Sequence, residues 1–119
     1  MYHTNPPAQI NQCIEACASC HRACLDAATY CLAQGGAHAA AAHVGLLLDC
    51  AQICATTGDF LIRSSPLHAG ACGTCADVCD KCADACEHFT GDAVMAACAI
   101  ACRTCAEACR RAAPIKLSR

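Results

Sequence analysis

The chain has 119 residues, about the size of one domain, with 16 cysteines, 3% aromatic residues and no tryptophan. The scarcity of aromatic and other strand-forming residues argues against a β-sandwich or a barrel. The formal net charge is −2 and the basic residues are scattered, so a nucleic-acid-binding surface is not expected.

Glycine and proline breaks divide the chain into four alanine-rich segments, each predicted to be one helix. Asn5-Pro6-Pro7 is typical of a capped helix start, and Gly35-Gly36 is typical of a helix end. Ser64-Ser65-Pro66 and Thr90-Gly91-Asp92 form the next breaks, and Pro114 closes the last segment. Because the loops are short, neighbouring helices should be antiparallel. We predict a single domain over 1–119 with helices at about 8–34, 38–63, 66–89 and 92–113.

The cysteines recur at helical spacing, with steps that are almost all three, four or seven residues. Such steps keep side chains on one face of a helix. The unit C-x3-C-x2-C-x3-C occurs as CIEACASCHRAC, CADVCDKCADAC and CAIACRTCAEAC. Cysteine therefore takes the seam where a bundle ordinarily places Leu and Ile. The pattern predicts an all-α protein, an antiparallel up-down-up-down four-helix bundle with cysteines lining the interior.

Inward-facing thiols in this number indicate metal binding. As small hydrophobic residues they would fill less volume than Leu, so stability does not explain them. Neighbours three or four residues apart on a helix are poorly placed for a disulfide, although cross-helix pairing on oxidation stays open. The predicted metal ligands are Cys13, Cys17, Cys20, Cys24, Cys31, Cys50, Cys54, Cys72, Cys75, Cys79, Cys82, Cys86, Cys98, Cys102, Cys105 and Cys109.

Charge and geometry favour Cu(I) as the metal. Four zinc tetrathiolate sites would bury a charge of about −8 with no basic residues nearby, and ferredoxin-type cysteine spacing is absent. Cu(I) is soft, selects thiolates and carries one charge, so it can replace each thiol proton without changing the charge of the core. If each ion bridges two thiolates and each thiolate two ions, the chain holds about 16 ions.

Such a capacity indicates storage or buffering of Cu(I), and nothing in the pattern requires an enzyme. A thiol redox or oxidant-buffering protein is one alternative, although no cysteine has an obvious activating basic partner. A zinc or iron–sulfur protein is the other.

With the three cysteine units in view, the sequence resembles the copper storage proteins, cysteine-lined four-helix bundles of bacteria, over essentially 13–109. The resemblance implies Cu(I) held by cysteine thiolates, a homotetramer of bundles, and an open end where His and Met gather. It applies residue by residue only to the cysteines. The second segment departs from the repeat, with only Cys50 and Cys54.

Five His and Met residues are possible accessory metal ligands. In an up-down bundle the end that holds Cys31 and Cys86 should be the open one. The accessory candidates there are His38, His43, His88 and Met95, and His68 lies at the opposite end near Cys72. His21 is expected at the boundary of the cysteine face, and His3 in an N-terminal tail.

The protein is expected in the cytoplasm, because residues 1–7 lack the basic and apolar regions of an export signal and many thiols need a reducing compartment. The most apolar stretch, 39–48, is interrupted by His43 and is too short to span a membrane. Leu47 shares the face of Cys50, whereas Leu46 and Leu48 do not. We therefore expect the second helix to contribute to a subunit interface.

Overall fold

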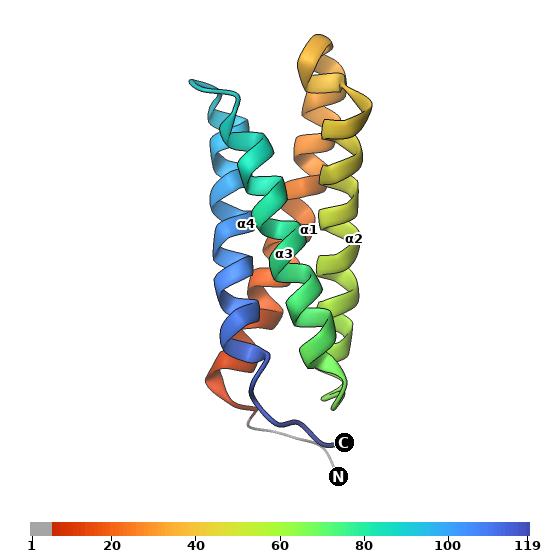
Figure 1. The fold of residues 1–119 in the computed structure, drawn as a ribbon, viewed down its shortest axis with the longest axis vertical. Helices are drawn as coiled ribbons and strands as arrows, with labels where there is room; N and C mark the ends of the chain where they lie inside the picture. The colour runs from red at the N-terminus through yellow and green to blue at the C-terminus, as the bar shows by residue number, and fades with distance from the viewer. Residues whose placement is uncertain (1–5) are drawn as a thin grey trace.

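Four α-helices form the molecule in a computed structural model that describes residues 6–119. They are α1 (Ala8–Gln34), α2 (Ala41–Ile62), α3 (His68–Glu87) and α4 (Ala93–Ala112), with a short 3-10 helix, η1 (Gly36–Ala39), between the first two. The helices alternate in direction along a bundle of 51 × 20 × 19 Å (Figure 1). No strand occurs in the described part of the chain. The predicted all-α, up-down-up-down bundle is confirmed.

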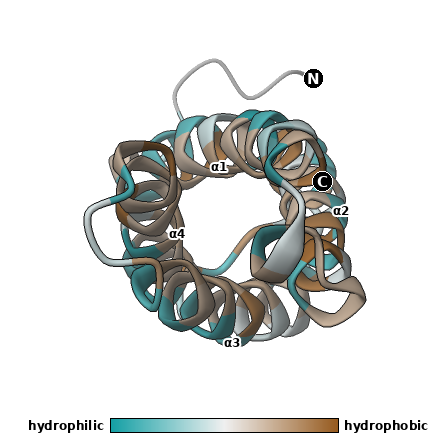
Figure 2. Cartoon of the chain, turned by 90° about the horizontal axis from the view of Figure 1, so that it is seen from above, coloured by the Kyte–Doolittle hydropathy of each residue, from teal (hydrophilic) through white to brown (hydrophobic). Residues whose placement is uncertain are grey.

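The four helices enclose one interior. α1 contacts α2 and α4, and α3 contacts the same two helices, so the helices form a ring (Figure 2). Figure 2 also shows that hydrophilic residues lie mainly on the outside of this ring. We call the end at the top of Figure 1 the entrance end; there the α1–α2 connection meets the α3–α4 loop. The opposite end is called the far end.

The connection between α1 and α2 is set by two glycines. Gly35 and Gly36 have φ values of +73° and +56°, which glycine adopts without the steric cost of a Cβ atom. The Gly35 N–H donates to the carbonyl of Cys31 at 3.2 Å and ends α1. The next four residues form η1, so α2 begins at Ala41 instead of residue 38. At the other end of α1, the helix begins directly after Pro7, and the predicted Asn5 cap lies outside the described residues.

The two later helix starts use different polar groups. Ser65 Oγ accepts the N–H of Leu67 at 3.1 Å, so this serine shapes the corner and α3 begins only at His68. Asp92 caps α4 directly, because its Oδ1 accepts the N–H groups of Val94 and Met95, both at 3.0 Å. The aspartate of the third break is therefore the one side-chain helix cap among the four described α-helices.

The core consists of sulfur and small side chains. All 16 cysteines are buried and free, and alanines of all four helices fill the spaces beside them. Large side chains are few: Ile10, Leu47, Leu61 and Met95 are fully buried. Thr57, Ser65 and His68 are the buried polar residues of the described chain, which places no Lys, Arg, Asp or Glu in the core.

α2 is apolar on more than one side. Leu47 is fully buried beside the cysteines, whereas Leu48 is 47% exposed. By length and composition alone, α2 is long and apolar enough to cross a membrane. Its most apolar 18 residues have a mean hydropathy of 1.3, and 33% of them are buried in the bundle. The helix is longer than the predicted stretch 39–48, because it continues past Asp49 to Ile62. A core helix of a bundle meets the same criteria, and α2 packs its cysteine face against α1 and α3.

Candidate metal centre

The thiols form an unbroken path of contacts through the bundle. At the far end, Cys13 and Cys109 Sγ atoms are 3.6 Å apart. In the middle, Cys50 Sγ lies 3.7 Å from Cys79 Sγ and 3.9 Å from Cys102 Sγ. The path continues to Cys24 and Cys98, whose Sγ atoms are 3.9 Å apart. Between these points each step of the path joins two sulfur atoms at 3.7–4.0 Å.

Sets of four sulfur atoms within 4.8 Å of one another occur along this path. The sets share members: Cys20 and Cys50 belong to two of them, and so does Cys54. Shared members mean that the sets are overlapping parts of one array. Five of the sets are Cys17/Cys75/Cys105/Cys109, Cys20/Cys50/Cys54/Cys79, Cys20/Cys24/Cys50/Cys102, Cys24/Cys82/Cys98/Cys102 and Cys54/Cys75/Cys79/Cys105.

The array arises from helical register. Each contributing helix places one sulfur atom about every turn, because its cysteines are three or four residues apart. Sulfur atoms from different helices then interleave across the interior: Cys20 of α1, Cys50 of α2 and Cys102 of α4 form a triangle with sides of 3.7–3.9 Å. Cys54 of α2 joins Cys75 of α3 at 3.7 Å. The two cysteines of α2 are thus central members of the array.

Hydrogen bonding between thiols makes their ionisation interdependent. Hydrogen bonding with Cys102 lowers the pKa of Cys20 to about 6, while the same partner raises the pKa of Cys24. Cys31 lies apart from the array, and burial raises the pKa of this thiol. One thiolate is therefore favoured by neighbouring S–H groups only while those neighbours keep their protons. A fully deprotonated array needs positive charge from bound cations, because the interior has no Lys or Arg among residues 6–119.

The entrance end holds a thiol, a thioether and an imidazole. The Cys31 thiol donates to the Met95 sulfur at 3.7 Å, and both residues are fully buried. The Nε2 atom of His43 is buried and has no hydrogen-bond partner within the described chain. Burial lowers the pKa of His43, so its imidazole is neutral at pH 7 and only one of its two nitrogens carries a proton. A buried nitrogen without a partner costs free energy unless it binds something.

Three further side chains organise the same end and were not predicted. Asp92 Oδ2 accepts the Tyr30 hydroxyl and the His38 Nε2–H, each at 2.8 Å. The backbone N–H of Met95, followed by His38, lowers the pKa of Asp92 to about 2, so this side chain is a carboxylate at neutral pH. The Phe89 ring contacts both His38 and His43, at centroid distances of 4.1 and 4.8 Å. Two signals existed in the sequence: Asp92 stands just before a predicted helix, and Tyr30 and Phe89 lie near the breaks at the two connections of this end.

The remaining histidines have backbone partners. His68 is buried at the far end, where its Nδ1 and Nε2 lie 3.0 and 3.1 Å from the carbonyl oxygens of Ser65 and Ala112. His88 is exposed, with Nδ1 at 2.7 Å from the Asp84 carbonyl. His21 Nδ1 lies 3.0 Å from the Ala51 carbonyl at the α1–α2 boundary. His3 lies outside the described residues. Of the predicted accessory ligands, the structure brings His38, His43 and Met95 together at the entrance end.

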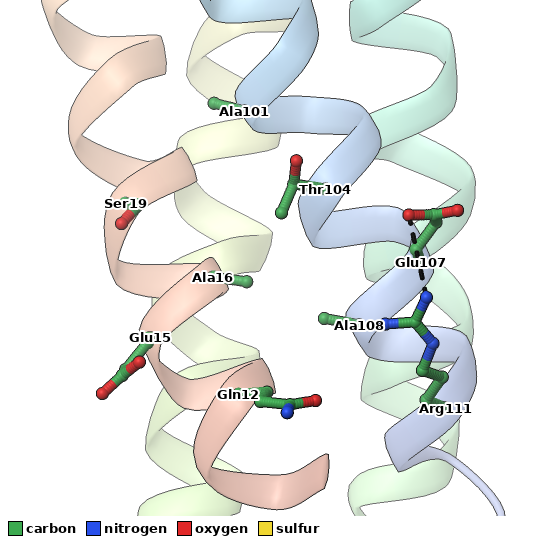
Figure 3. A pocket seen from close by; sticks show the side chains of 9 residues that line it. All are labelled: Gln12, Glu15, Ala16, Ser19, Ala101, Thr104, Glu107, Ala108 and Arg111. Atoms are coloured by element: carbon green, nitrogen blue, oxygen red, sulfur yellow. Dashed lines mark ion pairs between the residues drawn. The ribbon is translucent and has the colours of Figure 1, made fainter.

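A surface groove between α1 and α4 is separate from the thiol array (Figure 3). Its volume is about 410 Å³ and no cysteine lines it. Small side chains such as Ala16 and Ser19 of α1 and Ala101 of α4 line it, and Glu107 of α4 pairs with Arg111 at 3.9 Å. The groove therefore offers none of the thiols of the array.

A four-helix bundle whose interior is an array of reduced thiols defines the class of soft-metal-binding helical bundles. The chain belongs to the copper storage protein family, whose model matches residues 7–114.

Known proteins of this fold are similar over nearly the whole chain. The crystal structure of Nmul_A1745 from Nitrosospira multiformis is 42% identical, with a TM-score of 0.83, covering 89% of this chain and 95% of that one. The Cu(I)-bound copper storage protein BsCsp3 is 37% identical, with a TM-score of 0.82, covering 88% and 98%. Apo-Csp3 from Bacillus subtilis is 38% identical, with a TM-score of 0.76, covering 87% and 97%.

One curated relative is an uncharacterized cysteine-rich protein, YhjQ, of Bacillus subtilis strain 168. It is 40% identical over 66 residues, which are 56% of this chain and 61% of that protein. The alignment therefore spans less than two thirds of the relative's length, whereas the structural matches cover nearly whole chains.

Proposed function

We propose that this protein stores many Cu(I) ions inside its bundle, bound by the thiolates of all 16 cysteines. The observation that carries the proposal is the unbroken thiol path, with sulfur atoms 3.6–4.0 Å apart from Cys13 and Cys109 to Cys24 and Cys98. Membership in the copper storage family and the likeness to Cu(I)-bound BsCsp3 support the same metal.

The sulfur spacing suits low-coordinate ions. With a metal–sulfur distance of about 2.3 Å, as in zinc thiolates, three sulfurs around a trigonal ion are about 4.0 Å apart and two around a linear ion about 4.6 Å. The triangle of Cys20, Cys50 and Cys102, with sides of 3.7–3.9 Å, accepts a trigonal ion with almost no movement. Linear ions need adjacent sulfur atoms to separate by several tenths of an ångström. Bridging of each thiolate between ions gives about one Cu(I) per cysteine.

Zinc is the second candidate, because one feature of the array favours it. The edge of a zinc tetrathiolate is about 3.8 Å for the same metal–sulfur distance, and five of the six edges in the set Cys20/Cys24/Cys50/Cys102 measure 3.7–3.9 Å. Charge opposes zinc, since each such site carries a charge of −2 in an interior without Lys or Arg. The sharing of cysteines between sets opposes zinc as well. Three of the five named sets have no cysteine in common, and zinc bound in these three would use only twelve of the cysteines.

Copper is proposed to pass through the entrance end. Cys31, Met95 and His43 lie there, and a thioether or neutral imidazole binds Cu(I) more weakly than a thiolate, which suits transfer inward. His38 is proposed as an outer ligand. His88 and His68 are weaker candidates, because backbone carbonyls occupy the nitrogens named above.

A non-enzymatic cytoplasmic homotetramer is the proposed working form. The exposed apolar side chains support association, notably Leu48 at 47% and Ile62 at 64% exposed on α2. Sixteen reduced thiols support a reducing compartment. A chain that stays monomeric at micromolar concentration contradicts the tetramer without affecting copper binding.

Replacement of all cysteines by alanine tests the proposed ligands. After anaerobic exposure to Cu(I) and gel filtration, the wild-type protein should retain about one ion per cysteine and the variant none. Helical circular dichroism of the variant reports whether the fold survives. A helical variant that still retains copper refutes thiolate storage.

A further inference from the structure

Asp92 links three elements at the entrance end. Its Oδ1 caps α4 through the N–H groups of Val94 and Met95. Its Oδ2 accepts the hydroxyl of Tyr30 from α1 and the Nε2–H of His38 from η1, each at 2.8 Å. A single carboxylate thus fixes the start of the Met95 helix and the position of the His38 ring.

This contact decides which nitrogen of His38 is free. A carboxylate only accepts hydrogen bonds, so Nε2 carries the proton and Nδ1 of a neutral imidazole has the lone pair. Nδ1 has no hydrogen-bond partner in the described chain, and the His38 side chain is 22% exposed. A carboxylate that holds the far nitrogen of a histidine is the usual arrangement around metal-binding imidazoles, where it orients the ring and makes the ligand nitrogen more basic.

A second free imidazole nitrogen lies deeper. The rings of His38 and His43 both contact Phe89, with centroids 4.1 and 4.8 Å from the Phe89 centroid. The His43 Nε2 atom is buried and without a partner. The buried Cys31–Met95 pair lies at the same end. Free nitrogens therefore occur at two depths, one partly exposed and one buried.

We propose that Asp92 is a positioning residue for copper uptake: it holds His38 so that Nδ1 receives incoming Cu(I) before the ion passes to His43 and the thiols. The role rests on the proposed copper function and deepens it. Asp92 does not touch the metal, and it acts on the rate of uptake while the number of stored ions is set by the cysteines.

The substitution Asp92→Asn separates this role from helix capping. Asparagine is as good a cap as aspartate, so its Oδ1 can keep the α4 contacts. Its NH₂ group then faces His38 and cannot accept the Nε2–H. The matched control is Asp84→Asn, an exposed carboxylate on the outside of α3 that pairs with Arg103.

Stopped-flow uptake of Cu(I) from a coloured chelator measures the rate, and titration to saturation measures the capacity. Removal of such a partner typically costs 10- to 100-fold in metal affinity or activity. Asp92→Asn should therefore slow the first phase of Cu(I) uptake about tenfold without changing the capacity. Asp84→Asn should take up Cu(I) at the wild-type rate. His38→Ala combined with Asp92→Asn should be no slower than His38→Ala alone. Wild-type uptake by Asp92→Asn, or further slowing in the double variant, overturns the role.

Nitrogen-15 NMR of the copper-free wild type gives a test that does not depend on any variant. His38 should be the Nε2–H tautomer, and its Nδ1 signal should shift once the thiolates are filled and further Cu(I) is added, because thiolates bind Cu(I) more tightly than imidazole. The opposite tautomer, or an unaffected Nδ1 signal, overturns the proposal. A wild-type protein that binds few Cu(I) ions refutes the storage function itself, whereas full capacity with an unchanged Asp92→Asn rate refutes only the positioning role.

Discussion

Removal of one layer of the array gives a quantitative test of distributed storage. The layer consists of Cys20, Cys50 and Cys102, whose sulfur atoms form the triangle with 3.7–3.9 Å sides at the middle of the bundle. In the triple alanine variant, the copper capacity should fall by about three ions, because each thiol contributes one bridging ligand. The remaining cysteines should still fill, since two overlapping sets stay intact on the far side of the layer and Cys24, Cys82 and Cys98 stay together on the other side.

The same variant should be less stable without copper. Each substitution removes a buried atom comparable to a methylene, at about 1 kcal/mol including the small void, or about 3 kcal/mol for three. With an unfolding entropy of about 2.1 cal/mol/K per residue, this lowers the Tm of the 119-residue chain by about 12 °C. Circular dichroism at 222 nm follows the transition.

Leu47→Ala is the matched control. Leu47 is fully buried on the cysteine face of α2 but carries no ligand atom, and its truncation costs about 3 kcal/mol. It should therefore lower the Tm by a similar amount while the copper capacity remains that of the wild type. An unchanged capacity in the triple variant would mean that these thiols are not ligands. A capacity near zero would mean one indivisible cluster instead of a distributed store.

Three other predictions concern the outside, the entrance end and the metal. Asp80 pairs with Arg110 and Arg103, and hydrogen bonding to Arg110 is the main cause of the lowered pKa of Asp80. These ion pairs therefore stabilise the folded protein above the ordinary pKa of 3.8, and their contribution is lost as the pH falls through the lowered pKa. The free energy of unfolding measured in urea should be about 1 kcal/mol lower for Asp80→Asn than for the wild type at pH 6, and the difference should vanish as the pH falls below the lowered pKa of Asp80; a difference that does not change with pH would contradict the assignment. Met95→Leu keeps the shape but removes the thioether beside Cys31, so uptake of Cu(I) should slow with the capacity reduced by at most one ion; a large loss of capacity would contradict an accessory role. Zn²⁺ should saturate at about three or four ions by mass spectrometry and be displaced by Cu(I); retention of zinc in excess Cu(I) would favour the zinc alternative.

The helices and the composition of the core were predictable because the cysteine spacing matches the period of an α-helix. Steps of three, four and seven residues place Cys13 and Cys24 on one face irrespective of the rest of the chain. Burial of every cysteine follows once four such faces meet. The break at Gly35-Gly36 was predictable for a local reason as well, since both residues take positive φ.

Contacts between elements were not predictable in the same way. The Cys20–Cys50–Cys102 triangle depends on how far three helices slide along one another, which the spacing within each helix does not determine. The Tyr30–Asp92–His38 contact joins residues 62 and 54 positions apart. The short η1 helix replaced the expected start of α2 because the glycine turn continues as a 3-10 turn to Ala39.

Anaerobic titration of the fully reduced protein with Cu(I), in competition with a chelator of known affinity, is the most direct measurement of the central claim. An interior in which every buried cysteine binds a shared ion predicts saturation near 16 equivalents per chain. Saturation at one to four equivalents would contradict storage by the array and would instead indicate a few isolated thiolate sites.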